Sequence, residues 1–464
     1  MDCGGERATP PLWQCAERGD NHCNHRLRRS GLASLRPPVY ATRMIEALLD
    51  RFLRYVRIDT QSDDRSSSCP STPGQWDLLR LLASELSELG AADVQLTRYG
   101  YVLATVPATA TGRARTRARR LPRVALLAHV DTAPDFSGTS VKPVVHRRYA
   151  GGVIRFPDAP RLRLDPALDP VLRAAEGKDI VTASGATLLG ADDKAGVAVV
   201  MTVVEQLLRH PGRPHGPVRI CFTPDEEIGR GVDRLDLAEL GADVAYTLDG
   251  SHRGSICWEN FSADGALVTI DGVSTHPGDA HAQGMVNAAH LAGRFLASLP
   301  RERCAPETTG GKQGFIHPTR VEGGTSQATI KMILRDFELA GLAEKRAIVR
   351  GLCRGLQAAE PRARVRCAIR KQYRNMAYWL RQDMRPVELA RDAMRAIGIE
   401  PMDDPIRGGT DGARLTERGL PTPNLFCGAH NLHGPLEWVA AQDMADAVRT
   451  CVELVGLWAG PARR

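Results

Sequence analysis

The sequence predicts an α/β protein, a mainly parallel sheet flanked by helices, into which a smaller domain is inserted. Three observations support this fold class. Short apolar runs of strand length alternate with longer segments of helical period between about residues 75 and 250. Polar residues of chemical interest follow the ends of several of these runs. Between about residues 260 and 373 the pattern changes to the β-α-β-β-α-β order of a ferredoxin-like domain.

The elements of the first part follow one another in a simple order. A helical pattern begins at Met44, and a second one over 75–89 is closed by Gly90. The segment 196–210 has the length of a helix. Three apolar runs have the length and composition of buried parallel strands. They are 124–130, 218–224 and 244–250.

The inserted unit reads strand, helix, two strands, helix and strand. Its second long strand alternates, with Ala328, Ile330 and Met332 on one face and Thr329 and Lys331 on the other. Afterwards the α/β pattern resumes with a helix, a strand and a closing helix. We therefore expect a first part of an α/β domain, an inserted smaller domain and a second part of the α/β domain. Their predicted ranges are 44–258, 259–374 and 375–464.

Composition favours a globular enzyme of the cytoplasm. The 464 residues are 43% hydrophobic and 25% charged, and no run approaches the ~18 apolar residues of a transmembrane helix. Arg36, Pro37 and Pro38 interrupt the apolar stretch that a signal peptide would need. Eleven scattered cysteines without a C-x-x-C pair fit a reducing compartment. We expect no association with a membrane.

The net charge of +7 is concentrated in two segments. Residues 1–43 carry a net +3 and residues 108–123 a net +6, so the rest of the chain is slightly acidic at −2. A basic segment between strands is usually a solvated loop, and we therefore expect no nucleic acid as a partner. Residues 1–43 show no sustained period and are interpreted as a disordered extension.

Five segments carry side chains of the kind that bind zinc, and most of them follow predicted strands. Imidazoles and carboxylates suit zinc, and two neighbouring ions need a carboxylate that bridges them. Strands of an open α/β sheet present such residues at a shared edge. The sequence therefore predicts one metal centre. Its candidates are His129, Asp131, Asp192, Asp193, Glu226, Glu227, Asp249 and His433.

Each motif also has an ordinary interpretation. His129 and Asp131 could be a polar strand end, and Glu226-Glu227 could be a charge pair at a helix start. Asp192-Asp193 could cap a helix, a role that aspartate favours. His433 could be a loop histidine. Their order, spacing and placement at strand ends together favour the metal centre.

Three longer motifs, GADDKAG (190–196), PDEEIG (224–229) and IRGGTDGA (406–413), stand at characteristic separations. Through them the sequence resembles the peptidase T family, the tripeptide aminopeptidase branch of the dinuclear zinc exopeptidase and aminoacylase superfamily. The likeness covers roughly Met44 to Leu457. It implies a zinc-exopeptidase-like α/β domain with an inserted ferredoxin-like lid or dimerisation domain. It also implies a homodimer, short peptides as substrates and two Zn²⁺ per chain, with Co²⁺ or Mn²⁺ as substitutes.

The resemblance also implies a role for each matching residue. Glu226 matches the general base, and Asp131 matches the acid that orients an imidazole. His276 matches a histidine that helps to stabilise the oxyanion, often from the partner subunit. Asp192 matches the carboxylate that bridges both ions. The complete set of implied metal ligands is His129, Asp192, Glu227, Asp249 and His433.

The segment 407–411 looks like the substrate-side loop of the family. Its Arg407 could hold a peptide carboxylate through a bidentate pair, and its glycines permit close approach of the backbone. Tyr373 is a further candidate for the cleft. The complete set of predicted substrate-binding residues is Arg407, Gly408, Gly409, Thr410, Arg335 and Asn287.

Two segments, 1–43 and 113–120, depart from the family pattern, and His430 is a competing imidazole before the last predicted ligand. The alternative functions are a related zinc carboxypeptidase, a dipeptidase or an N-acyl amino acid hydrolase. From another class, a non-catalytic scaffold could keep the same fold. A nucleic-acid binder would use the arginine-rich segment.

Overall fold

The computed structural model describes residues 39–109 and 121–460. The expectations for residues 1–38 and for the arginine-rich segment lie outside these residues. The chain divides into two compact units, Met1–Thr42 and Arg43–Arg464, and the contacts described below lie within the second. The first helix, α1, spans Val39–Tyr55, so the predicted start at Met44 is wrong. No glycine or proline separates Val39 from Met44, so nothing in the sequence stops the helix from extending toward Pro38.

An eight-stranded sheet has the order β1-β2-β8-β3-β9-β16-β10-β15. The four adjacent strands β8, β3, β9 and β16 are parallel, as predicted. The antiparallel strands β1 and β2 extend one edge. The strand bounds are β1 Ala92–Leu96, β2 Val102–Val106, β3 Val124–His129, β8 Val218–Thr223, β9 Val244–Gly250, β10 Ser255–Cys257, β15 Met402–Asp403 and β16 Asn424–Phe426.

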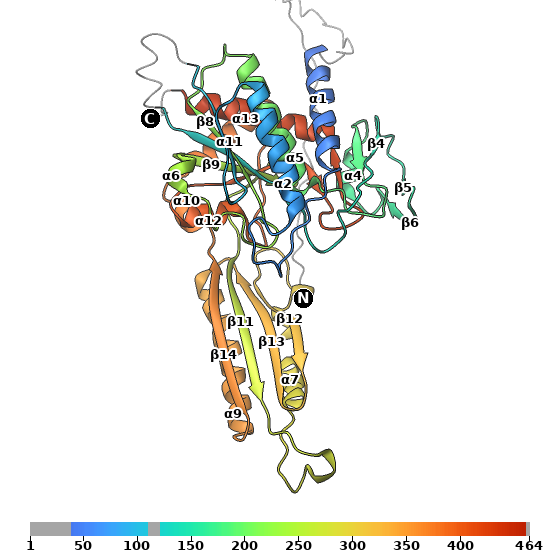
Figure 1. Cartoon of the computed structure of the whole chain (residues 1–464), viewed down its shortest axis with the longest axis vertical. Helices are drawn as coiled ribbons and strands as arrows, with labels where there is room; N and C mark the ends of the chain where they lie inside the picture. Colours follow the sequence, from blue (N-terminus) through green and yellow to red (C-terminus); the bar gives the residue numbers. More distant parts are fainter. Residues whose placement is uncertain (1–38, 110–120, 461–464) are drawn as a thin grey trace, which may run out of the picture. The chain divides into compact units, whose positions relative to one another are not determined.

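Helices cover both faces of this sheet, which explains why its central strands are continuously apolar. In β3, Leu126 packs into the core beneath α1, α2, α5, α11 and α13, whereas Leu127 packs into a second core with α6 and α12. Figure 1 shows α2 and α5 lying along the sheet. The helix bounds are α2 Pro73–Leu89, α5 Ala191–Arg209, α6 Leu237–Leu240, α11 Arg385–Ala396, α12 Asp411–Glu417 and α13 Ala441–Trp458.

A four-stranded antiparallel sheet of order β12-β13-β11-β14 carries α7 and α9 (Figure 1). Its chain order is β-α-β-β-α-β, so the predicted ferredoxin-like insertion is confirmed. One sheet face packs with both helices around Ile330 and Val349. The bounds are β11 Ser262–Asp271, α7 Ala288–Ala297, β12 Phe315–Gly323, β13 Gln327–Asp336, α9 Leu339–Ala359 and β14 Arg364–Tyr373.

Several short elements have no counterpart in the sequence analysis. Strands of two to six residues form a small sheet β17-β18-β7-β4 and a hairpin β5-β6. They are too short to show a period. Their bounds, with three short helices, are β4 Val144–His146, β5 Ile154–Phe156, β6 Ala159–Leu164, α4 Pro170–Ala174, β7 Ile180–Thr182, α8 Arg301–Cys304, α10 Ala377–Leu380, β17 Ala429–His430 and β18 Trp438–Ala440.

The helices of the described residues include no candidate membrane span. Within residues 39–109 and 121–460, none combines the length and the apolar character needed to cross a bilayer.

The close contact between α5 and β9 depends on Gly196. A β-carbon at this position would collide with the backbone carbonyl of Leu248 and with the carboxylate of Asp193. We expect Gly196→Ala to lower the free energy of unfolding by about 1–3 kcal/mol, because backbone must shift to admit the methyl group. Denaturant unfolding measures this change.

Gly293 in α7 provides the matched control, because a β-carbon there meets no atom within 4 Å. Gly293→Ala is expected to raise the free energy of unfolding by up to about 1 kcal/mol, since alanine favours a helix. Equal effects of the two substitutions would contradict the packing described for Gly196.

Candidate metal centre

Five side chains meet at the carboxyl edge of the parallel strands. His129 ends β3, Asp249 lies in β9 and Asp192 lies at the start of α5. Glu227 follows β8, and His433 follows the short strand β17, which comes after β16 in the chain. Because these strands are parallel neighbours, their carboxyl ends share one edge. The structure thus brings together all five residues that were predicted as ligands.

Two imidazoles face the two oxygens of one carboxylate. Nε2 of His129 lies 3.0 Å from Oδ1 of Asp192 and 3.7 Å from Oδ1 of Asp249. Nε2 of His433 lies 3.3 Å from Oδ2 of Asp192 and 3.1 Å from Oε2 of Glu227. Asp192 therefore stands between two sets of donors, which is the position of a carboxylate that bridges two ions.

These separations fit zinc. Ligand atoms held tetrahedrally at ~2.0–2.1 Å from zinc lie about 3.3 Å from one another. The four distances above range from 3.0 to 3.7 Å. In addition, Oε1 of Glu227 is buried and has no hydrogen-bond partner, a costly state unless a cation meets it. The donor set therefore suits a divalent ion on each side of Asp192.

Asp193, a candidate of the sequence analysis that the resemblance does not include among the ligands, belongs to the same cluster. In the described part of the chain, two triplets have potential ligand atoms within 4.8 Å: His129, Asp192 and Glu227, and His129, Asp193 and Asp249. However, Oδ2 of Asp193 accepts the backbone N–H of His129 at 3.2 Å, and Oδ1 accepts that of Gly196 at 3.1 Å. We infer that Asp193 fixes the start of α5 rather than binding an ion.

The cluster carries an excess of buried negative charge. Burial, followed by the proximity of Asp192, raises the pKa of Asp249 to about 6 and that of Glu227 to about 8. Burial lowers the pKa of His129, but hydrogen bonds to Asp131, Asp192 and Asp249 together raise it well above its ordinary value. Divalent cations bound at this cluster would balance the negative charge of its carboxylates.

Asp131 connects His129 to the segment that carries Glu226. Its Oδ1 lies 3.3 Å from Nδ1 of His129, the ring nitrogen on the far side from Asp192. The same carboxylate accepts the backbone N–H groups of Glu226 at 3.0 Å and Glu227 at 3.1 Å. A carboxylate at Nδ1 sets the ring orientation and leaves Nε2 for a metal. This geometry suits the predicted orienting role.

Glu226 lies beside the five predicted ligands. It lines a small recess together with His129 and Asp249. Loss of hydration, with further contributions from Asp411, Asp249 and Glu227, raises its pKa well above the ordinary value. A raised pKa makes the ionised carboxylate a stronger base, which favours the proton transfers of a general base and acid.

Glu437 is a part of the site that the sequence analysis missed. Its Oε2 accepts the backbone N–H groups of Leu189 and Gly190 at 2.8 Å, and its Oε1 accepts that of Asp192 at 2.9 Å. The buried carboxylate therefore fixes the backbone from which Asp192 projects. The available signal was an acid beside the apolar Trp438, only a few residues after His433.

Arg407 is already engaged within the protein. Its guanidinium donates to the backbone carbonyls of Gly311 at 2.6 Å, Gln313 at 2.9 Å and Thr309 at 3.3 Å. It also lies over the ring of Phe261. To bind a peptide carboxylate, as predicted, Arg407 would have to give up its hydrogen bonds to these carbonyls.

The rest of the 407–411 loop borders a cavity of about 450 Å³. The cavity is lined by Glu226, Tyr373, Gly409 and Thr410, among other residues. A β-carbon at Gly409 would lie 2.6 Å from the Tyr373 ring, so this position requires glycine. Thr410 caps α12 through Ala413, and a β-carbon at Gly408 would lie 3.7 Å from the Ile406 side chain, an ordinary contact.

The remaining predicted residues do not gather at the cluster. Arg335 donates to Gln372 at 2.8 Å and lies over Tyr373, which lines the cavity. The side-chain oxygen of Asn287 caps α7. His276 is exposed in the loop after β11 and accepts a hydrogen bond from the backbone N–H of Gly278. The geometry thus gives Asn287 a structural contact and leaves the role of His276 a prediction.

His430 does not compete with His433. It packs on the ring of Trp438 at a centroid distance of 4.4 Å and lies edge-on to His252. Burial lowers its pKa to about 4. A buried, neutral imidazole between aromatic rings is a packing residue, and it belongs to neither potential ligand group in the described chain.

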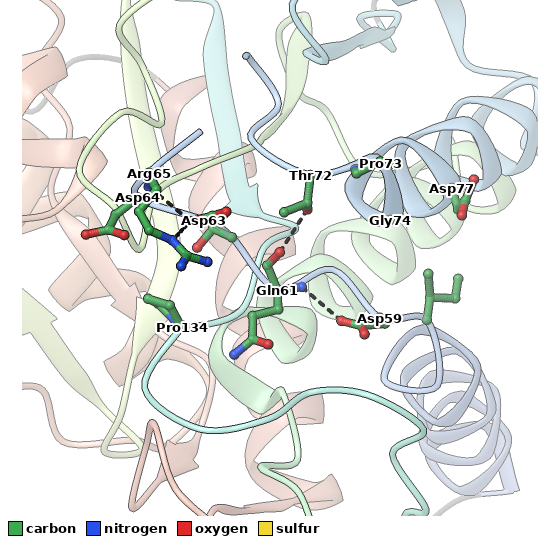
Figure 2. A pocket seen from close by; sticks show the side chains of 12 residues that line it. Asp59, Gln61, Asp63, Asp64, Arg65, Thr72, Pro73, Gly74, Asp77 and Pro134 are labelled. Carbon is green, nitrogen blue, oxygen red and sulfur yellow. Dashed lines mark hydrogen bonds and ion pairs between the residues drawn. The ribbon is translucent and has the colours of Figure 1, made fainter. Parts of the chain in front are cut away.

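A larger, open cavity of about 940 Å³ lies outside the metal centre (Figure 2). Two of its acidic residues have local partners: Asp59 accepts hydrogen bonds from Gln61 and Thr139, and Asp63 from Arg65. It includes none of the predicted site residues. Several predicted site residues, among them Glu226, line the smaller cavity instead.

The chain belongs to a metallopeptidase family. The model of Peptidase family M20/M25/M40 matches residues 186–456. Curated relatives named Peptidase T include one from Geobacillus thermodenitrificans, 41% identical over 415 residues, and one from an Exiguobacterium species, 42% identical over 416 residues. These alignments cover 89% and 90% of this chain and 99% of each relative.

Solved structures with the same fold include an aminopeptidase PepT from Bacillus cereus and a tripeptidase from Staphylococcus aureus. Both have a TM-score of 0.68, at 21% and 18% identity. They cover 90% and 89% of this chain, and the alignments span 99% and 98% of the two structures. The predicted resemblance and fold class are confirmed.

Proposed function

We propose that this protein is a metallo-aminopeptidase that hydrolyses the N-terminal peptide bond of tripeptides. One observation carries the proposal: the two oxygens of Asp192 lie 3.0 Å and 3.3 Å from the imidazoles of His129 and His433. The relatives named Peptidase T, at 41–42% identity over nearly their whole length, support peptide hydrolysis.

In this proposal two zinc ions occupy the centre, with Co²⁺ or Mn²⁺ as substitutes. His129 and Asp249 would hold one ion, His433 and Glu227 would hold the other, and Asp192 would contribute a ligand to both. Bound zinc would polarise the scissile carbonyl and lower the pKa of water. Asp131 holds the His129 ring in place through Nδ1.

Glu226 performs the proton transfers. Its carboxylate accepts a proton from the attacking water and delivers it to the nitrogen of the departing dipeptide. The backbone N–H of Glu226 is fixed by Asp131, so the base and the first imidazole are held by one carboxylate. Asp131 therefore fixes the position of Glu226 relative to the predicted ligand His129.

We further propose a homodimer in which His276 of one subunit serves the site of the other. Strand β11 spans ten residues from Ser262 to Asp271, about 30 Å at ~3.3 Å per residue. His276 follows its far end, whereas Ala263 near its start pairs with the cavity residue Tyr373. A protein that sediments only as a monomer would contradict this role.

The division into 44–258, 259–374 and 375–464 is part of the same proposal. The change of sheet between β10 and β11, and the return to α10 after β14, support these boundaries. We also propose action in the cytoplasm, which is supported by free thiols at all eight cysteines of the described part of the chain. Exclusive recovery of the protein from a secreted fraction would contradict it.

A free tripeptide and its N-acetylated form together test the activity. We expect the zinc-loaded protein to release the N-terminal amino acid from the free tripeptide and to leave the acetylated one intact. Chromatography of the products identifies which bond is cut. A chelator-treated sample is the control and should be inactive until zinc is restored.

The products also separate the alternatives. Release of the C-terminal residue would indicate a carboxypeptidase, and cleavage of only the acetylated form would indicate an N-acyl hydrolase. Activity confined to dipeptides would indicate a dipeptidase. Absence of any hydrolysis with two zinc ions bound would indicate a non-catalytic scaffold.

A further inference from the structure

Two hollows meet beside Glu226, and only two residues line both. The cavity of about 450 Å³ borders the 407–411 loop, and the small recess borders His129 and Asp249. Glu226 and Asp411 are the residues they share. Asp411 is 5% exposed, so its carboxylate lies within the wall between the hollows rather than on the surface.

An aminopeptidase has to receive a positive charge at this place. The substrate's α-ammonium group has a pKa near 8 and is charged at neutral pH. It lies about 2.5 Å from the scissile carbonyl carbon, two covalent bonds away. A charge buried so close to the reacting bond is costly without an anionic partner. One carboxylate near Glu226 should therefore face the ammonium group.

Four of the acids that line the two hollows have other roles, which leaves one carboxylate to face the ammonium group. Five acids line the two hollows: Asp193, Glu226, Glu227, Asp249 and Asp411. Glu227 and Asp249 face the imidazoles as ligands, and Glu226 is the proposed base. Asp193 uses both oxygens on backbone N–H groups. Asp411 has no assigned partner of opposite charge.

The carboxylate of Asp411 has a hydrogen-bond donor but, among the described residues, no cationic partner. Thr223, at the end of β8, donates its hydroxyl to Oδ2 of Asp411 at 2.9 Å. Gly231 packs against the carboxylate, and a β-carbon there would collide with both oxygens. Within residues 39–109 and 121–460, Asp411 forms no ion pair with a lysine, arginine or histidine. The nearby Arg414 pairs with Asp233 instead.

We propose that Asp411 binds the α-ammonium group of the substrate and thereby selects peptides with a free N-terminus. This inference rests on the proposed aminopeptidase function and adds the residue that recognises the amine. The carboxylate accepts N–H bonds from the ammonium group while Thr223 keeps it aimed at the junction of the two hollows.

Trialanine and propionyl-dialanine provide the test, because they differ only in the α-amino group. We expect the wild-type protein to prefer trialanine strongly in kcat/KM. Asp411→Asn should reduce that preference roughly 10- to 100-fold, mainly through KM, since a hydrogen bond to a charged group is lost. Metal content, measured in parallel, should remain unchanged.

Asp50→Asn is the control, because it makes the same chemical change at an exposed residue of α1 that lines neither hollow. It should leave the preference for trialanine unchanged. An Asp411→Asn protein that folds, binds metal and keeps the wild-type preference would overturn the inference. If that variant does not fold, Thr223→Val takes its place and should lower the preference several-fold; an unchanged preference again overturns it.

A failure of the proposed function would look different. Wild-type protein that cleaves neither peptide would reject the aminopeptidase activity itself. Wild-type protein that cleaves both peptides equally, while still releasing the N-terminal residue, would reject only the assignment of Asp411.

Discussion

Replacement of Glu226 by glutamine should remove most activity and leave the metal centre intact. The amide keeps the size of the side chain but cannot accept the proton of the attacking water. General acid–base catalysis contributes about 10²–10⁴-fold, so kcat on a tripeptide should fall by that factor. Zinc content and the melting temperature should stay at wild-type values, because Glu226 is not among the predicted ligands.

The control for this substitution is Glu88→Gln on the exposed side of α2. It makes the same chemical change away from the cluster and should leave kcat unchanged. Wild-type turnover in Glu226→Gln would reject the proposed base. Loss of zinc in that variant would instead place Glu226 among the ligands.

Replacement of Asp192 by asparagine should empty at least one of the two metal positions. The carboxylate presents Oδ1 to His129 and Oδ2 to His433. An asparagine side chain offers one acceptor oxygen and one NH₂ group, so it cannot bridge two cations. We expect zinc to fall from about two ions per chain to one or fewer and activity to fall with it. Metal analysis of the purified variant measures the change.

Asp193→Asn is the natural comparison, because Asp193 belongs to the same cluster. Its oxygens accept backbone N–H groups, so this variant should unfold more readily but keep both ions. Loss of an ion from Asp193→Asn, with full occupancy in Asp192→Asn, would reverse the assignment of the two residues.

Much of the fold could be predicted because the larger elements carry strong periodic signals. The run 124–130 is apolar on both faces, as a strand between two helical layers must be. The strands of the β-α-β-β-α-β insertion could be predicted from alternating apolar residues such as Ala328 and Ile330. The strands β7 and β18 have only three residues each and leave no comparable pattern.

The five predicted ligands were accessible to sequence reasoning because each lies at or near a strand end or helix start. The supporting contacts were less accessible. The three backbone bonds of Glu437 depend on how the segment after His433 folds back on α5, and no local pattern encodes this. Likewise, the sequence shows that Arg407 has donors but not that the carbonyls of 309–313 accept them.

The most direct test of the central claim is a crystal structure of the zinc-loaded protein with anomalous diffraction measured at the zinc edge. Two anomalous peaks about 3.5–4 Å apart are expected. Asp192 should lie between them, with His129 and Asp249 at one peak and His433 and Glu227 at the other. Two zinc ions bound elsewhere, or a single ion that leaves His433 unliganded, would contradict the account.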